Sequence, residues 1–379
     1  MLFSEIIGQS ATKARLVQMY HNGRVPHAML FIGQEGNGAL PLAIAYAQYI
    51  NCTDPNKHDG EACGRCPSCI KYNKLTHPDL HFIFPIIKKD SSSSPVYSDT
   101  YIEEWRALFA EEHYFSLPQW LAKIRGDKQG IISKDDAVAI HQKLGQKSME
   151  AEYKVLIMWC PELMNETASN RILKILEEPP AKTLFILVSE SEADILPTIL
   201  SRTQRFNIPP IDDEAMVKSV MRLHPAFPED KVRRMVHISM GNMVRLNQIM
   251  HPDENSKVNL EFFMSLMRIG YQRNIVTMTS FAEEVKKLSR EALKARLGYS
   301  IHMIREALVY NLQNEQLSNL TKEEETFLTK FAVFIHHNNA FKIIDMLNEA
   351  YLHVERNGSA GMIIFDILMQ MASLLKIKP

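Results

Sequence analysis

Residues 28–40 read AMLFIGQEGNGAL, and this stretch decides the fold of the first part of the chain. It begins with an apolar run of strand length and continues into a turn that contains Gly33, Gly36 and Gly38. A helical pattern follows over about residues 40–50. A strand, a glycine-rich turn and a helix in this order are typical of a phosphate-binding loop, whose backbone N–H groups surround an anion. The stretch therefore predicts a βα unit of a parallel α/β domain.

The loop lacks the side chains that act on a nucleoside triphosphate. A working loop of this kind continues with a Lys that reaches the phosphates and a Ser or Thr that holds Mg²⁺. In this chain the two places are Ala39 and Leu40, whose side chains neither neutralise a phosphate nor bind a metal. Because glycine patterns alone are weak signals, a chance glycine-rich turn is the alternative interpretation.

A second predicted strand also lacks catalytic side chains. Residues 153–159 form an apolar run of strand length. In phosphate-loop ATPases such a strand ends in an Asp that holds Mg²⁺ and often a Glu that activates water, but here these places are Trp159 and Cys160. No base lies near Cys160 in the sequence, so we expect a small buried side chain rather than a nucleophile. The catalytic side chains are missing from both the loop and the strand, while the strands, the glycine-rich turn and the helix around them are retained. This combination indicates an ATPase scaffold that does not hydrolyse ATP.

The rest of the chain divides by its periodicity. Residues 165–178 have helical spacing and stop at two prolines, and residues 183–188 predict a third strand. Beyond about residue 208 the strand patterns disappear and the periodic stretches are helical. The fold class is therefore α/β plus all-α, and we expect three domains. Their predicted bounds are 1–208 for the α/β domain, 209–254 for a small helical domain and 255–379 for a helical C-terminal domain.

The α/β domain contains an inserted segment over about residues 88–129. It starts with a serine-rich run, residues 88–95, that has the composition of a mobile loop. Aromatic residues then follow between positions 101 and 125. Such stripes usually belong to a core, so we expect one or two helices packed on the α/β domain. A patch that docks a partner is the alternative.

Four of the five cysteines are clustered within one short module. They are Cys52, Cys63, Cys66 and Cys69. Four thiolates close a tetrahedral zinc site with no open position, which predicts one structural Zn²⁺. Tight clustering without an export signal favours metal binding in a reducing cytosol over disulfides, so we expect a cytoplasmic protein. Four free thiols are the alternative.

Composition excludes several classes of protein. Hydrophobic residues make up 46% and charged residues 23% of the chain, which is typical of a soluble globular protein. A net charge of −1 does not favour nucleic-acid binding by the whole chain. No apolar run approaches the roughly 20 residues that cross a bilayer, so we expect no membrane partner.

In their order along the chain, these motifs resemble the bacterial clamp-loader family, its delta-prime and gamma/tau subunits. Further stretches carry the resemblance: PHAMLF at residues 26–31, HPD at 77–79, LKILEEPP at 173–180 and LPTILSR at 196–202. The match is close over residues 1–210, plausible over 211–250 and thin over 255–379. The resemblance implies a RecA-like AAA+ core, a helical lid and a C-terminal collar that joins the subunits.

The resemblance also implies a task. A clamp loader opens a ring-shaped sliding clamp and places it on primed DNA, and its gamma/tau subunits hydrolyse ATP. Delta-prime members commonly have a degraded phosphate loop and act as a stator, and Ala39, Leu40, Trp159 and Cys160 assign this chain to that group. The implied partners are the gamma/tau and delta subunits, with the clamp and primed DNA reached through the assembled complex.

One arginine is implied to act on a neighbour. Ser201-Arg202-Thr203 stands where the family has Ser-Arg-Cys, whose Arg projects into the ATP site of an adjacent subunit. A fixed guanidinium can bind γ-phosphate oxygens and stabilise the transferring charge. We therefore expect a trans-acting arginine finger at Arg202, beside Ser201, and no catalytic residue for a site of the chain's own.

Two other functions stay open at this stage. An active gamma/tau-type ATPase subunit would require a Lys at Ala39 and an acid at Trp159. A zinc-dependent DNA-binding protein would require a basic element near residues 63–69, where acidic and basic residues balance.

Overall fold

The computed structural model describes residues 1–54, 60–87, 96–124, 130–250, 254–311 and 322–378. The chain divides into two compact units. The first comprises Met1–Val236 and Met240–Arg245, and the second comprises His237–Ser239 and Leu246–Pro379. The expected domain bounds at 208 and 254 stay predictions.

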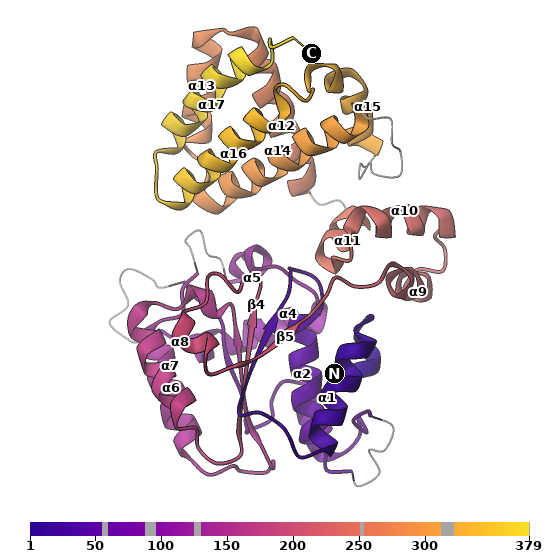
Figure 1. The fold of residues 1–379 in the computed structure, drawn as a ribbon, viewed down its shortest axis with the longest axis vertical. Helices are drawn as coiled ribbons and strands as arrows, with labels where there is room; N and C mark the ends of the chain where they lie inside the picture. Colours follow the sequence, from indigo (N-terminus) through magenta and orange to yellow (C-terminus); the bar gives the residue numbers. More distant parts are fainter. Residues whose placement is uncertain (55–59, 88–95, 125–129, 251–253, 312–321, 379) are drawn as a thin grey trace. The chain divides into compact units, whose positions relative to one another are not determined.

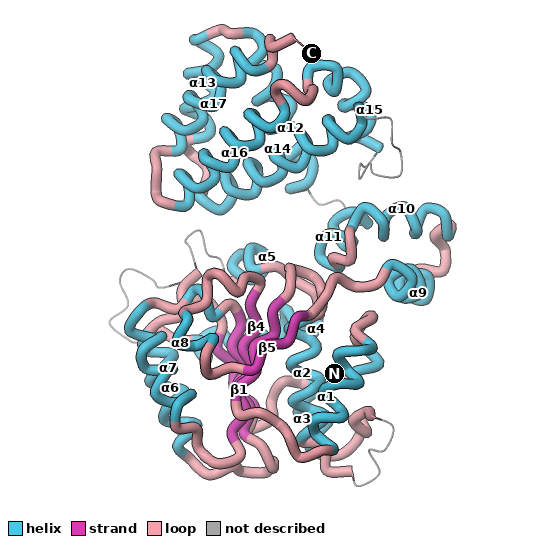
Figure 2. Tube along the Cα trace, viewed as in Figure 1, coloured by secondary structure: helices cyan, strands magenta, loops and turns pink. Residues whose placement is uncertain are grey.

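The first unit is built on a five-stranded sheet in the order β2-β3-β4-β1-β5, with all neighbours parallel (Figures 1 and 2). Its strands are β1 (Ala28–Ile32), β2 (Leu80–Ile83), β3 (Lys154–Trp159), β4 (Thr183–Ser189) and β5 (Gln204–Asn207). The predicted α/β class and three predicted strands are confirmed. The sequence did not reveal β2 and β5, the two edge strands, which are only four residues long each.

Helices cover both faces of this sheet (Figure 1). Side chains alternate along a strand, so Met29 and Phe31 of β1 pack with α2 while Ala28 and Leu30 pack with α6 and α7. The predicted helices at 40–50 and 165–178 are present as α2 and α7. Outside the inserted segment, the helices that precede β5 are η1 (Phe3–Glu5), α1 (Ser10–His21), α2 (Ala39–Ile50), α3 (Pro67–Asn73), α6 (Lys134–Gly145), η3 (Pro161–Leu163), α7 (Glu166–Glu177) and α8 (Pro197–Leu200), where η marks a 3₁₀ helix.

The inserted segment packs into the core of the first unit. It forms η2 (Ser98–Tyr101), α4 (Ile102–Glu111) and α5 (Leu117–Lys123). Trp105 and Trp120 are fully buried, and Trp105 stacks on Phe84 with ring centroids 4.3 Å apart. The indole N–H of Trp120 donates to the Pro85 carbonyl at 2.7 Å. The prediction of core helices is confirmed, whereas the serine-rich run at 88–95 lies outside the described residues.

Every described element after β5 is helical, as predicted. The first are α9 (Asp213–Leu223), α10 (Glu229–Ser239) and α11 (Met243–Met250). The second unit buries an apolar core between α12 (Glu254–Gln272), α13 (Ile275–Val285), α14 (Arg290–Asn311), α15 (Lys322–Phe331), η5 (Ala332–Phe334), α16 (Ala340–Glu355) and α17 (Ala360–Leu374). Among the described residues, no helix combines the length and apolar character needed to span a bilayer.

Candidate functional site

The glycine-rich turn has the backbone of a phosphate loop. Gly33 directly follows β1, and α2 begins at Ala39. Gly36 and Gly38 have φ angles of 71° and 91°, in the left-handed region that favours glycine. The chain therefore turns sharply from the carboxyl end of β1 into the beginning of α2, where a helix can hold an anion.

The loop satisfies its own polar groups. The side chain of Asn37 accepts a hydrogen bond from the Ala39 N–H at 3.0 Å and donates to the Ile208 carbonyl at 2.7 Å. Gln9 donates to the Asn37 carbonyl at 3.0 Å. The N–H groups at a helix start are the donors that a bound phosphate would use. One of these N–H groups, that of Ala39, already donates to the Asn37 side chain.

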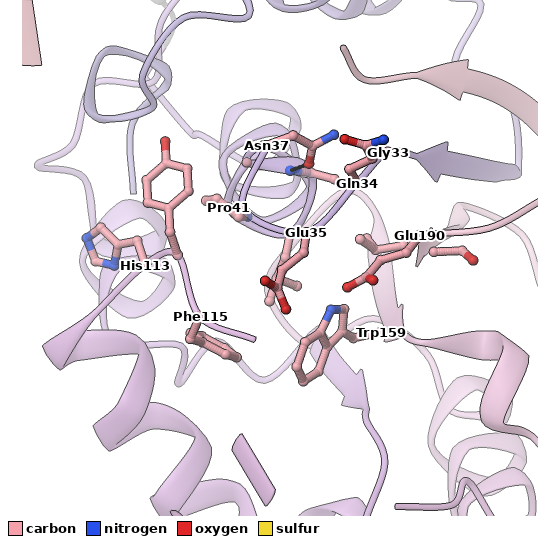
Figure 3. A pocket seen from close by; sticks show the side chains of 16 residues that line it. Gly33, Gln34, Glu35, Asn37, Pro41, His113, Phe115, Trp159 and Glu190 are labelled. Atoms are coloured by element: carbon pink, nitrogen blue, oxygen red, sulfur yellow. Dashed lines mark hydrogen bonds between the residues drawn. The ribbon is translucent and has the colours of Figure 1, made fainter. Parts of the chain in front are cut away.

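Aromatic side chains fill the space in front of the loop (Figure 3). Trp159 enters from the end of β3, and Tyr114 and Phe115 enter from the inserted segment. The rings of Phe115 and Trp159 lie 5.4 Å apart, and the Tyr114 hydroxyl accepts from the Ile7 N–H at 2.9 Å. The remaining cavity has a volume of about 40 Å³. Small-molecule sites usually measure about 300–1,000 Å³, so this cavity is smaller than such a site and has the size of a few waters.

The same pocket is acidic. Glu35 and Glu190 face it, and among the residues that the structure describes, neither Lys nor Arg lines it (Figure 3). Glu190 is an exposed residue, yet partial burial of its carboxyl and the charges of Glu35 and Glu162 raise its pKa to about 7. Burial also raises the pKa of Glu35 and of Glu162. Carboxylates without a counter-cation repel a polyphosphate.

The structure places both predicted residues of the degenerate strand in the core. Trp159 is 6% exposed and Cys160 is 3% exposed. Burial raises the pKa of the Cys160 thiol well above its ordinary value. The expected burial of this side chain is confirmed, and its lack of nucleophilic character stays a prediction. The place of Tyr114 and Phe115 in the lining of this pocket was not predicted, because the position of the insertion relative to the loop depends on the tertiary fold.

Arg202 lies on the turn after α8, and it does not line the pocket of its own chain. Its guanidinium pairs with Glu177 at 2.6 Å and donates to the Thr198 carbonyl at 2.9 Å and to the Ser201 hydroxyl at 3.1 Å. Its side chain is 34% exposed and that of Glu177 is 49% exposed. Such a pair contributes at most about 1 kcal/mol, so a stronger anion can displace Glu177.

The four clustered cysteines come together in space. Their sulfurs all lie within 4.8 Å of one another. Tetrahedral zinc with Zn–S bonds of about 2.3 Å places sulfurs roughly 3.8 Å apart, and Cys63 Sγ and Cys69 Sγ are separated by 3.9 Å. Backbone N–H groups of Cys63, Cys66 and Cys69 donate to cluster sulfurs at 3.3–3.4 Å, which favours thiolates. The donor set fits a structural zinc ion.

Fold and site together combine a parallel α/β sheet with a strand, glycine-rich turn and helix of phosphate-loop form, and aromatic side chains lie in front of the turn. The chain belongs to the family described as DNA polymerase III, delta subunit, whose profile matches residues 8–212. The resemblance to clamp-loader subunits is thereby confirmed.

Named relatives agree with this family. The chain is 28% identical to DNA polymerase III subunit delta' of Haemophilus influenzae, over 60% of this chain and 56% of the relative. It is 25% identical to the Bacillus subtilis subunit delta', over 53% of this chain and 49% of the relative. It is 24% identical to the Mycobacterium tuberculosis subunit gamma/tau, over 64% of this chain and 35% of the relative. The chain thus spans about half the length of the delta' relatives it matches. A gamma subunit-related protein of Thermotoga maritima superposes with a TM-score of 0.46 at 13% identity, covering 96% of this chain and 99% of that one.

Proposed function

We propose that this chain is a delta-prime-type subunit of the DNA polymerase III clamp loader that helps place the sliding clamp on primed DNA without hydrolysing ATP itself. The observation that carries the proposal is the closed, acidic phosphate loop, with a cavity of about 40 Å³ behind Tyr114, Phe115 and Trp159. In this assignment residues 1–208 are the AAA+ domain, 209–254 the lid and 255–379 the collar that joins the gamma/tau and delta subunits.

A stator requires a loop that holds the next domain without a nucleotide. The Gly36 carbonyl accepts a hydrogen bond from the Met243 N–H at 3.0 Å. The side chain of Glu35 hydrogen bonds with that of Asn242. A Cβ on Gly36 would lie 1.9 Å from Asn242 Oδ1, so the contact admits only glycine. Nucleotide switches move such segments by gaining or losing phosphate contacts. Here direct bonds between loop and lid residues replace those contacts, which supports a fixed geometry.

Arg202 would serve the ATP site of a neighbouring subunit. Glu177, Thr198 and Ser201 hold its guanidinium at the surface while no ATP is near. A γ-phosphate carries more charge than one carboxylate and accepts two parallel N–H bonds, so it would displace Glu177. The guanidinium would then stabilise the charge that moves during phosphoryl transfer.

The zinc ion would be structural. Bound by Cys52, Cys63, Cys66 and Cys69, it would crosslink the end of α2 to the beginning of α3. All four positions of a tetrahedral ion would be filled by sulfur, which leaves none for a substrate.

Restoring the loop chemistry should not restore an ATPase. We expect no steady-state ATP turnover from the isolated chain or from the double variant Ala39→Lys, Leu40→Thr. The reason is that Tyr114 and Phe115 still line the pocket and the end of β3 still carries Trp159 and Cys160 in place of acidic residues. The measurement is phosphate release with Mg²⁺ and ATP, with an intact gamma/tau-type subunit as the positive control. Turnover that follows either chain through purification would refute the proposal of a silent ATPase.

A further inference from the structure

A second and larger cavity lies at the other end of the sheet. Its volume is about 410 Å³, within the range of about 300–1,000 Å³ that is usual for small-molecule sites. It is lined by residues at the amino ends of β2 and β3, whereas the phosphate loop follows the carboxyl end of β1. The proposed loader function uses none of its residues.

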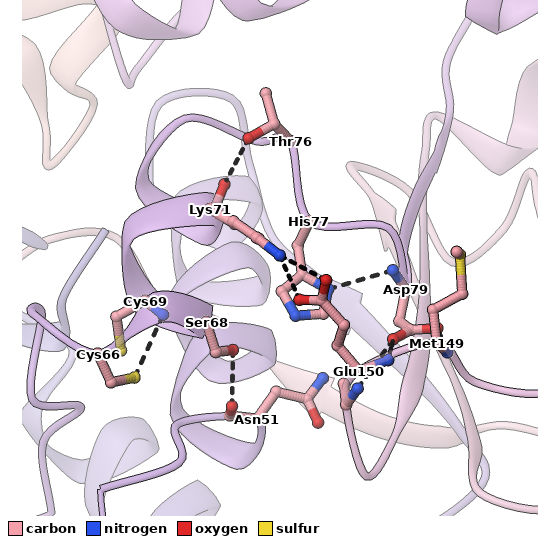
Figure 4. A network of polar contacts seen from close by, with 11 residues as sticks. Asn51, Cys66, Ser68, Cys69, Lys71, Thr76, His77, Asp79, Met149 and Glu150 are labelled. Atoms are coloured by element: carbon pink, nitrogen blue, oxygen red, sulfur yellow. Dashed lines mark hydrogen bonds and ion pairs between the residues drawn. The ribbon is translucent and has the colours of Figure 1, made fainter.

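The wall of this cavity is fixed by hydrogen bonds (Figure 4). The carboxylate of Asp79 accepts from the backbone N–H groups of Met149, Glu150 and Ala151 at 2.7, 2.8 and 2.9 Å. The Asp79 N–H donates to His77 Nδ1 at 3.1 Å. Because these bonds join the segment before β2 to the segment before β3, the cavity exists before any ligand arrives.

The charged side chains of the lining leave an excess of positive charge. Four are cationic and two are acidic: Arg106, Lys143, Lys147, Lys154, Asp79 and Asp99. Asp79 stays ionised, with its carboxylate accepting from three backbone N–H groups, and Asp99 pairs with Lys143. Lys154 is 4% exposed and donates to the Leu144 and Gln146 carbonyls. The remaining cations are Lys147 and Arg106, and Arg106 pairs with the exposed Glu103, which does not line the cavity.

Both remaining cations have unused donors. Arg106 donates from Nε to the Leu75 carbonyl at 3.0 Å and from Nη1 to Glu103 at 2.7 Å. Its Nη2 and the exposed ammonium of Lys147 form no hydrogen bond within the part of the chain that the structure describes. Arg106 lies on α4 and Lys147 follows α6, so the two cations come from separate elements. A guanidinium and an ammonium with free N–H groups are suited to phosphate oxygens.

A neutral donor and an apolar wall complete the site. Burial, with the charge of Lys143, lowers the pKa of His81 to about 4, so its imidazole is neutral at pH 7 and carries one N–H. Leu80, Phe82 and Ile102 supply apolar surface to the same cavity. The lining thus combines cations with a surface on which a ring can pack.

We propose that this cavity binds a small phosphorylated molecule of nucleotide size. Its phosphate is held by Arg106 and Lys147, and its ring packs against the apolar wall. This site is independent of the degenerate phosphate loop, because the two lie at opposite ends of the parallel strands.

The proposal is tested by calorimetric titration of the full zinc-containing chain with adenosine monophosphate, inorganic pyrophosphate and adenosine as separate probes. We expect saturable binding of adenosine monophosphate with one site per chain, weaker binding of pyrophosphate and none of adenosine at millimolar concentration. Arg106→Gln with Lys147→Gln should lower the affinity about tenfold or more, because two charge-assisted contacts are removed. Lys147→Gln alone, a change at an exposed position, should weaken binding without affecting the thermal melt.

Two control variants separate this site from the phosphate loop. Lys74→Gln removes an exposed charge that does not line the cavity and should leave the affinity unchanged. Glu190→Gln removes a negative charge at the loop pocket and should also have no effect. Absence of saturable binding, or affinity that responds to Glu190→Gln and not to Lys147→Gln, would overturn the proposal. An affinity that responds to Glu190→Gln would also count against a closed phosphate loop. Absence of saturable binding would leave the proposed loader function unaffected.

Discussion

A clamp loader assembled with the Arg202→Ala variant should hydrolyse ATP more slowly than one assembled with the wild-type chain, by about the share of turnover that comes from the one ATP site that Arg202 would serve. Arginine fingers supplied across an interface are worth about 10³–10⁵ in turnover in other phosphoryl-transfer systems. We expect a smaller effect because the ATP sites of the gamma/tau subunits that Arg202 does not serve would stay active. The variant should fold normally, since the ion pair of Arg202 with Glu177 is exposed. The measurement is clamp- and DNA-stimulated ATPase at matched assembly.

Arg205 provides a matched control for this experiment. Arg205 lies on strand β5, its side chain is 50% exposed, and it pairs with Glu192 at 2.5 Å. Arg205→Ala should leave the ATPase rate unchanged. If the Arg202→Ala complex forms fully and turns over at the wild-type rate, Arg202 is an ordinary surface arginine.

Removing zinc should unfold the cysteine module and leave the second unit intact. Structural zinc contributes on the order of 10 kcal/mol to the folding of small modules. Removing the ion therefore costs more folding free energy than the packing of the cysteine module can supply. We expect one zinc per chain by elemental analysis. A chelator should raise hydrogen exchange around Cys52, Cys63, Cys66 and Cys69, and helices α16 and α17 should keep their protection.

The fifth cysteine separates zinc binding from a general effect of cysteine loss. Cys63→Ser should lower the zinc content well below one per chain, because three sulfurs do not close a tetrahedral site. Cys160→Ala should retain the full zinc content, since Cys160 lies outside the cluster. Fresh protein with far less than one zinc per chain would show that the cluster is not a metal site.

The features that the sequence predicted well are those whose parts are close together in the chain. The βα turn at Gly33–Gly38 and the cysteine module are local patterns, so spacing alone indicates their geometry. Strand β5 was missed because Phe206 is its only buried residue, which leaves no apolar pattern. Its neighbours Gln204 and Arg205 are exposed, as in a loop.

The closure of the pocket could not be predicted, because it depends on residues that meet only in the folded chain. Tyr114 and Phe115 come from the inserted segment, and their aromatic character predicted a core without saying which surface it covers. Glu177 likewise contacts Arg202 only after α7 and α8 pack together. Ala39 and Trp159 in the sequence predicted lost catalysis, and the tertiary fold adds the rings of Tyr114 and Phe115 in front of the loop.

The most direct measurement is the number of ATP molecules bound by a loader assembled from this chain with gamma/tau- and delta-type subunits. We expect the chain to co-purify in that complex, and the bound ATP to equal the number of gamma/tau subunits, with none on this chain. A complex that binds one further ATP, lost when Ala39 and Leu40 are replaced by bulky residues, would contradict a closed nucleotide site. A chain that never enters the complex would contradict the loader assignment itself.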